Sequence, residues 1–147
     1  MAFLDKLKFN LWDSPTTVID LIDRWKPRGC KTEKDYELSL YEFLHKELGE
    51  TQITKQYAHG RVRADLVVAA KVIIELKTNL DSTGKFQRLI GQMSAYEEWD
   101  GKVVILLTGK TDENLLKELK SQMKKLNERA GGLLVISSGT KFYLSEK

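Results

Sequence analysis

The sequence contains little cysteine, histidine or proline. Among its 147 residues there is one cysteine, and there are two histidines and two prolines. The single Cys30 excludes an intrachain disulfide and a cysteine-ligated iron–sulfur or zinc site, so we expect a reducing, cytoplasmic environment. The two histidines, His45 and His59, are far apart and offer neither the HxxxH spacing of a zinc site nor a recognisable Ser-His-Asp triad. No GxxxxGK[ST] loop is present, so nucleotide-driven motor activity is not indicated.

Long apolar runs are also missing. The longest, such as "LVVAA" and "VVILL", are far too short to cross a bilayer. Asp5, Lys6 and Lys8 interrupt the first twelve residues, which therefore lack the apolar core of a secretion signal. We expect no membrane association. The net charge of +3 is compatible with a polyanionic partner without requiring one.

Hydrophobic periodicity predicts an α/β fold. Helical spacing and capping residues predict helices, and alternation with turn formers predicts strands. The predicted helices cover residues 15–26, 32–49, 86–99 and 112–130, and the predicted strands cover 52–57, 61–68, 72–78, 102–108, 133–137 and 141–145. The first three strands read as an antiparallel meander, and helices separate the later ones. This order predicts one domain with a central mixed sheet flanked by helices.

The second and third strands, "VRADLVVAAKVIIELKT", place three charges in an otherwise apolar hairpin. Asp65 and Glu75 are equally far from Ala70, so a symmetric hairpin puts them opposite each other, with β-carbons about 4.5–5.5 Å apart. Alternation puts Lys77 on the same face. Two carboxylates at that distance repel unless a cation lies between them, and hard oxygen ligands suit Mg²⁺ or Mn²⁺. We therefore predict a metal site formed by Asp65, Glu75 and the backbone carbonyl of Leu76.

Such a site has the chemistry to hydrolyse phosphodiesters. A divalent ion neutralises phosphate charge and lowers the pKa of a bound water, and the Lys77 ammonium lies where it can act on water and phosphate. The alternative is an interstrand salt bridge on a solvated face, which is common and contributes little. The apolar flanks "LVV" and "VII" indicate strands buried on both faces, which makes an idle ion cluster the weaker interpretation.

The pattern Asp65, then Glu75-Leu76-Lys77 after an apolar strand, resembles the signature of the PD-(D/E)xK nuclease superfamily. Residues 32–108 match the restriction-endonuclease-like order of helix, three strands, helix and strand. Ala64 stands where the family usually has proline. The resemblance implies Mg²⁺-dependent hydrolysis of DNA, and it implies that a glutamate on the first core helix assists the metal site. Glu37 is the matching candidate, with Glu42 as the alternative.

The helix after the motif carries Gln92 and Tyr96, which resemble the QxxxY element of RecB-like members of the same superfamily. One helical turn separates the two residues, so they share a face, and the resemblance implies that they lie beside the active site. The alternative is that Tyr96 is a core residue and Gln92 is solvated. Gln87 is a second candidate for the glutamine.

We accordingly expect an Mg²⁺- or Mn²⁺-dependent deoxyribonuclease in which a helical extension (1–31) precedes the catalytic core (32–108) and a C-terminal helix with strands (109–147) follows it. The expected catalytic residues are Asp65, Glu75, Lys77, Glu37 and Gln92, and the expected nucleic-acid contacts are Arg61, Arg63, Lys85, Arg88 and Tyr96. By analogy with small nucleases of this fold, a homodimer is plausible. Two alternatives stay open: a non-catalytic nucleic-acid-binding protein, and a junction-resolving or RNA-directed nuclease.

Overall fold

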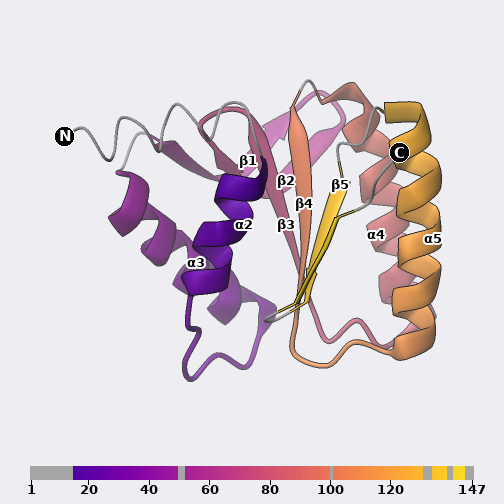
Figure 1. Cartoon of the computed structure of the whole chain (residues 1–147), viewed down its shortest axis with the longest axis horizontal. Helices are drawn as coiled ribbons and strands as arrows, with labels where there is room; N and C mark the ends of the chain where they lie inside the picture. The colour runs from indigo at the N-terminus through magenta and orange to yellow at the C-terminus, as the bar shows by residue number, and fades with distance from the viewer. Residues whose placement is uncertain (1–14, 50–51, 100, 131–133, 139–140, 145–147) are drawn as a thin grey trace.

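A mixed β-sheet lies between two layers of helices (Figure 1). The computed structural model describes residues 15–49, 52–99, 101–130, 134–138 and 141–144, so the first 14 residues of the predicted extension lie outside the described part. The helices are α2 (Pro15–Arg24), α3 (Glu33–Leu48), α4 (Thr83–Ala95) and α5 (Glu113–Ala130), with a 3₁₀ turn, η2, at Tyr96–Glu98. The strands are β1 (Ile53–His59), β2 (Val62–Val68), β3 (Val72–Thr78), β4 (Lys102–Thr108), β5 (Leu134–Ser138) and β6 (Lys141–Leu144).

Within the described residues the six strands form one sheet in the order β1-β2-β3-β4-β5-β6. Strands β1, β2 and β3 are antiparallel neighbours, β3, β4 and β5 run parallel, and β6 is antiparallel to β5. The parallel connections run through α4 and α5, as helical crossovers require. The predicted α/β fold with a mixed sheet flanked by helices is therefore confirmed.

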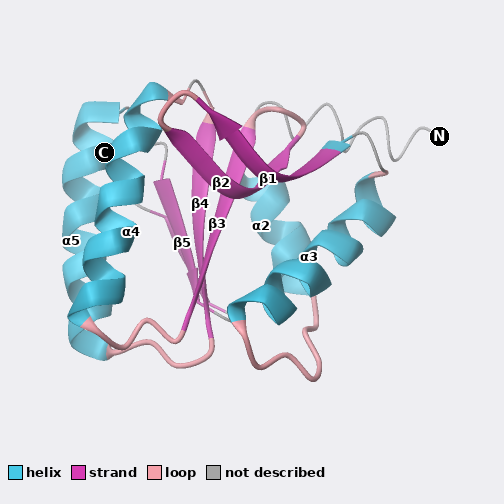
Figure 2. Cartoon of the chain, turned by 180° about the vertical axis from the view of Figure 1, so that it is seen from behind, coloured by secondary structure: helices cyan, strands magenta, loops and turns pink. Residues whose placement is uncertain are grey.

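Helices α2 and α3 cover one face of the sheet (Figure 2). Leu40, Leu44 and Leu48 repeat every fourth position along α3, and they pack against β-strand residues such as Ile74 and Leu76. The start of α3 is fixed by a capping box in which the Thr32 hydroxyl accepts from the Asp35 amide and the Asp35 carboxylate accepts from the Thr32 amide. This cap sets where the acidic residues of the first two turns lie.

Helices α4 and α5 cover the other face. Leu89 and Met93 of α4 and Leu119 and Met123 of α5 pack on sheet residues that include Ile73. The sequence predicted that α4 begins at Phe86 and continues to Trp99, and both limits are wrong. Helix α4 begins at Thr83 because the Ser82 hydroxyl accepts from the Lys85 amide and caps the helix, and it tightens into the 3₁₀ turn after Ala95.

The hairpin between β2 and β3 has the register that the sequence predicted. Leu66 pairs with Ile74 and Val68 with Val72, and the same register continued outward puts Asp65 opposite Glu75. Ala69 and Ala70 close the turn with φ of 53° and 54°. Both residues are therefore left-handed, as in the two-residue turns that match the twist of antiparallel strands.

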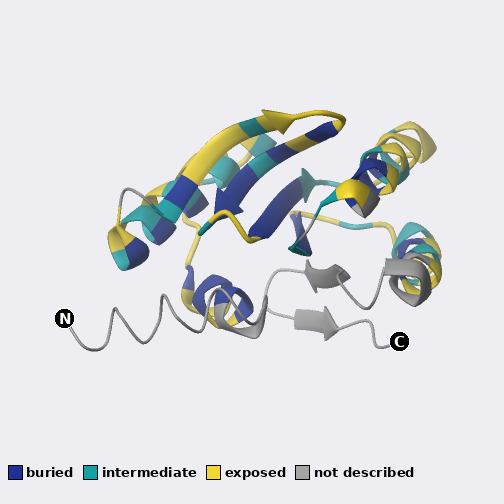
Figure 3. Ribbon diagram, turned by 90° about the horizontal axis from the view of Figure 1, so that it is seen from above, coloured by how far each residue is buried: buried dark blue, intermediate teal, exposed yellow. Residues whose placement is uncertain are grey.

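Exposure differs sharply across the sheet (Figure 3). The edge strand β1 is mostly exposed, whereas β3 is buried from Val72 to Leu76. A carboxylate in β3 is consequently removed from water by its position alone. In the described part of the chain, no helix combines the length and apolar character needed to cross a membrane.

Candidate metal centre

The candidate site lies where β2 separates from β3. The ladder between these strands ends at the pair Leu66–Ile74, although both strands continue. Beyond that point β3 keeps its parallel partner β4 as far as Thr78. The edge of β3 that faced β2 is thereby left without a strand partner, and its backbone groups need others.

Two carboxylates take the place of the missing strand. The Leu76 amide donates to Asp65 Oδ2 at 2.9 Å, and the Thr78 amide donates to Glu33 Oε1 at 2.9 Å. Residues 76 and 78 present their amides to the same side of a strand. Asp65 thus extends across the gap toward β3, and Glu33 closes the gap from α3. The carbonyl of Leu76 belongs to the same open edge, as the predicted metal site requires.

Glu75 is buried in this gap with a relative exposure of 1 %. Within the described residues neither of its carboxylate oxygens has a hydrogen-bond partner, and its ion pair is with Lys77, where Nζ lies 3.5 Å from Oε2. A buried carboxylate with both oxygens unsatisfied is costly, because the water it lost is not replaced. Such a group needs either a proton or a cation.

The electrostatics of the two acids fit one positive charge between them. Burial, followed by the negative charge of Asp65, raises the pKa of Glu75 from its ordinary 4.5 to about 8. Burial also raises the pKa of Asp65, although its hydrogen bond from the Leu76 amide opposes that change. Since the Leu76 amide donates to Asp65 and Glu75 is the more deeply buried of the two, Asp65 ionises first and its charge then opposes ionisation of Glu75.

Lys77 lies at the mouth of the site. Its side chain is 20 % exposed, so the ammonium contacts both Glu75 and the space in front of it. The predicted alternation is consistent with the structure. Ile73 packs in the core beneath α4, so Glu75 and Lys77, two and four positions later, lie on the same face of β3. Val67 packs in that core as well, so Asp65 shares this face.

Helix α3 adds acidic residues from the other layer. The charges of Glu37 and Glu33 both raise the pKa of Asp65, which places these two glutamates near it. They are four residues apart and share one face of α3. Glu42 is exposed, and no contact joins it to this site in the described residues, so the structure favours Glu37 of the two predicted alternatives. Sequence reasoning missed Glu33; its spacing of four from Glu37 was the available signal.

Helix α4 supplies Gln92, and the 3₁₀ turn η2 that follows it supplies Tyr96. Gln92 has a buried side-chain oxygen, Oε1, that finds no hydrogen-bond partner among the described residues. Tyr96 is 3 % exposed, and its hydroxyl donates to the Arg63 carbonyl at 3.0 Å, which ties the free end of β2 to α4. This buried position argues against the predicted contact between Tyr96 and nucleic acid. The alternative candidate Gln87 is exposed.

Basic side chains line two grooves beside α4. One has a volume of about 730 Å³ and the other about 620 Å³, and Arg88 and Gln92 line both. Lys31, Lys77 and Lys85 line the first groove, and Arg61 and Arg63 line the second. Since two lining residues are common to both grooves, one basic path runs past the mouth of the acidic pair.

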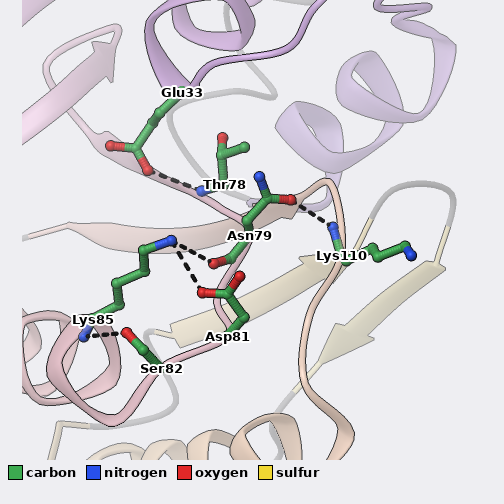
Figure 4. A network of polar contacts seen from close by, with 7 residues as sticks. All are labelled: Glu33, Thr78, Asn79, Asp81, Ser82, Lys85 and Lys110. Atoms are coloured by element: carbon green, nitrogen blue, oxygen red, sulfur yellow. Dashed lines mark hydrogen bonds and ion pairs between the residues drawn. The ribbon is translucent and has the colours of Figure 1, made fainter.

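Some of these cations already have partners. Arg63 donates to the Gly60 and Val62 carbonyls, and Arg61 lies 3.7 Å from Glu98 on the surface. Lys85 donates to the Asn79 carbonyl and pairs with Asp81 (Figure 4). Arg88 is exposed and, within the described residues, has no ion-pair partner, so it is the cation most available to a phosphate.

The loops at the ends of β3 and β4 hold this region in place. Figure 4 shows the polar contacts of Glu33 with Thr78, of Lys85 with Asn79 and Asp81, and of Asn79 with Lys110. Asn79 Oδ1 accepts from the Lys110 amide at 3.0 Å, and the Asn79 amide donates to the Thr108 carbonyl at 3.0 Å. The site is therefore built on braced strand ends rather than on a free loop.

The donor set fits a hard divalent cation. Asp65 and Glu75 offer carboxylate oxygens, both oxygens of Glu75 lack a hydrogen-bond partner among the residues described, and the Leu76 carbonyl lies on the same open edge. In the described part of the chain, no three side chains of His, Cys, Asp or Glu cluster as metal ligands. Mg²⁺ is commonly held by one or two carboxylates with water completing its shell, so two acids and a carbonyl are an adequate set.

Comparison with known proteins identifies no relative. No family model matches the chain, no curated protein matches it, and no solved structure matches it. The functional argument therefore depends on the residues and their geometry.

Proposed function

We propose that this protein is a metal-dependent nuclease that hydrolyses phosphodiester bonds in DNA. The observation that carries the proposal is the buried Glu75 carboxylate: in the described part of the chain it has no hydrogen-bond partner, and it lies beside Lys77 at the register position opposite Asp65. A structural salt bridge would satisfy the carboxylate, and this contact leaves it open to a further cation. The resemblance to PD-(D/E)xK nucleases points to the same residues.

Asp65, Glu75 and the Leu76 carbonyl would hold Mg²⁺ or Mn²⁺. When bound, the ion supplies positive charge against the scissile phosphate and lowers the pKa of a water. Lys77 keeps its ammonium at the mouth of the site through its contact with Glu75, where it stabilises negative charge on the phosphate and orients the attacking water. Gln92 lines the same groove as Lys77, where its amide would help to position the substrate.

The path of the substrate follows from charge. The grooves that flank α4 carry Arg61, Arg63 and Arg88 on one side and Lys31 and Lys85 on the other, so a phosphate backbone along α4 passes Lys77. Backbone contacts of this kind position a nucleic acid without reading its sequence. Arg88 is the contact with most to gain, since within the described residues nothing else neutralises it.

Cleavage of linear, circular, single-stranded and branched DNA and of RNA, with Mg²⁺, Mn²⁺ or EDTA, tests the proposal. We expect cleavage with either metal, none with EDTA, and a loss of at least about 100-fold in Glu75→Gln and Lys77→Met. Glu42→Gln is the matched control, because this glutamate is exposed and, among the described residues, no contact joins it to the acidic pair. Wild-type activity in Glu75→Gln would refute the proposal.

A non-catalytic nucleic-acid-binding role is the second candidate, and the basic grooves favour it. Calorimetry with Mn²⁺ separates the two. DNA binding that weakens with salt, without metal binding or cleavage, would identify a binding protein.

A further inference from the structure

Gln56 of β1 has an unusual backbone conformation, and its register position is opposite Asp65. Its φ is 50°, the left-handed region, although it lies inside a strand. Lys55 pairs with Leu66 and Tyr57 with Ala64, so the register sets Gln56 opposite Asp65, but these two do not pair. The ladders on both sides of β2 are therefore interrupted at the same residue, Asp65.

The side chain of Gln56 leaves its own strand and contacts helix α3. Its amide nitrogen, Nε2, donates a hydrogen bond to Glu37 Oε1. Gln56 is exposed, so burial of its side chain does little to offset the cost of a left-handed residue with a β-carbon. Backbone strain of this kind is found at functional sites, where the surrounding structure holds it in place.

The contact acts on the acidic pair through Glu37. Glu37 accepts from Gln56, whose register position is opposite Asp65, so this contact brings Glu37 to the point where both ladders of β2 are interrupted. Gln56 and Glu37 line one groove together with Glu33, whose carboxylate is held by the Thr78 amide. The Gln56 amide gives Glu37 the same kind of support, because a neutral donor orients a carboxylate without cancelling its charge.

We infer that Gln56 is a positioning residue: its left-handed backbone aims the side-chain amide at Glu37 and holds that carboxylate beside Asp65 for the metal-dependent reaction. The inference rests on the proposed nuclease function. It assigns a role to the break in β1, which neither the sequence motif nor the acidic pair explains.

Two substitutions separate this role from a structural one. Gln56→Gly keeps the left-handed backbone without strain and removes the amide, so we expect it to unfold at the same temperature as the wild type or higher. Gln56→Glu keeps the shape and replaces the donor by a second negative charge. In both, we expect Mn²⁺ affinity by calorimetry and kcat on DNA to fall by about 10-fold or more. Ala70→Gly is the matched control: it relieves a left-handed residue at the far end of the hairpin and leaves both quantities unchanged.

A double-mutant cycle identifies the partner. If Gln56 acts through Glu37, then Glu37→Gln with Gln56→Gly weakens Mn²⁺ binding no more than Glu37→Gln alone. Wild-type Mn²⁺ affinity and kcat in Gln56→Gly and Gln56→Glu would overturn the inference while leaving the nuclease proposal intact. Fully additive losses would also overturn it, because Gln56 would then act without Glu37. A wild-type protein that neither binds Mn²⁺ nor cleaves would refute both proposals.

Discussion

The metal-free protein is expected to lose stability as pH rises, and Glu75 is expected to be the main cause. The pKa of Glu75 is raised to about 8 in the folded protein from an ordinary 4.5. Between these values the folded state keeps a proton that the unfolded state has released. The free energy of unfolding therefore falls as pH increases through this window, and the stabilising contribution is fully present only below about pH 4.5.

The size of the effect follows from the same values. Each pH unit in the window costs about 1.4 kcal/mol for one such group, so a rise from pH 5 to pH 8 costs about 4 kcal/mol. That is a large share of the roughly 5–15 kcal/mol that stabilises a typical domain. Glu75→Gln removes the titrating group and keeps the shape of the side chain. Between pH 5 and pH 8, the free energy of unfolding of Glu75→Gln should therefore fall by less than that of the wild type, and the difference should be most of this 4 kcal/mol, about 3 kcal/mol or more.

Urea unfolding followed by circular dichroism, in EDTA at pH 5, 6.5 and 8, measures the difference. Adding Mn²⁺ at pH 8 should restore stability to the wild type and have little effect on Glu75→Gln, because a ligand that binds the folded state stabilises it. Glu42→Gln, at an exposed position on α3, controls for the loss of a glutamate. Parallel pH profiles for wild type and Glu75→Gln would refute the assignment of a raised pKa to this carboxylate, and with it the main reason to expect a cation there.

Three further outcomes follow from other parts of the structure. Arg88→Gln should weaken DNA binding and reduce the slope of log affinity against log salt by about 0.9, measured by fluorescence anisotropy on duplex DNA over a salt series. Gly109→Ala should destabilise the protein by about 2 kcal/mol in urea unfolding, because φ is +69° and a β-carbon would lie 2.3 Å from Asn79 Oδ1, which is held by the Lys110 amide. Ala70→Gly should raise stability by up to about 1 kcal/mol in the same assay, since φ is 54° and the residue is exposed.

The sequence predicted the hairpin because two local signals agree there. Alternation fixes which residues share a face, and the short turn at Ala69 and Ala70 fixes the register, so the positions of Asp65 and Glu75 followed from counting. The limits of α4 were wrong because Ser82 caps the helix one turn earlier than the loop composition suggested. A cap depends on a single hydroxyl, and the surrounding turn-forming residues obscured it.

The interruption of the ladders at Asp65 could not be predicted in this way. Periodicity describes a strand as regular. It gives no reason for β2 to separate from β3 beyond the pair Leu66–Ile74, or for Gln56 to adopt a left-handed backbone. Glu33 was missed for the same reason. Its carboxylate accepts from the Thr78 amide because the separation of β2 removes the strand that would otherwise pair with this edge of β3, and sequence periodicity does not reveal that separation.

This separation of strands also explains how one site draws residues from both helical layers. A continuous sheet would screen α3 from α4, and an acid on β3 could then reach only the side chains of its own face. Because β2 departs at Asp65, Glu33 of α3 accepts from the Thr78 amide at the open edge of β3, and the charges of Glu33 and Glu37 raise the pKa of Asp65. On the other side, Tyr96 ties the free end of β2 to the end of α4 through the Arg63 carbonyl. The opening that exposes the backbone edge of β3 is therefore the same feature that gathers the carboxylates, and restoring the ladder would remove both.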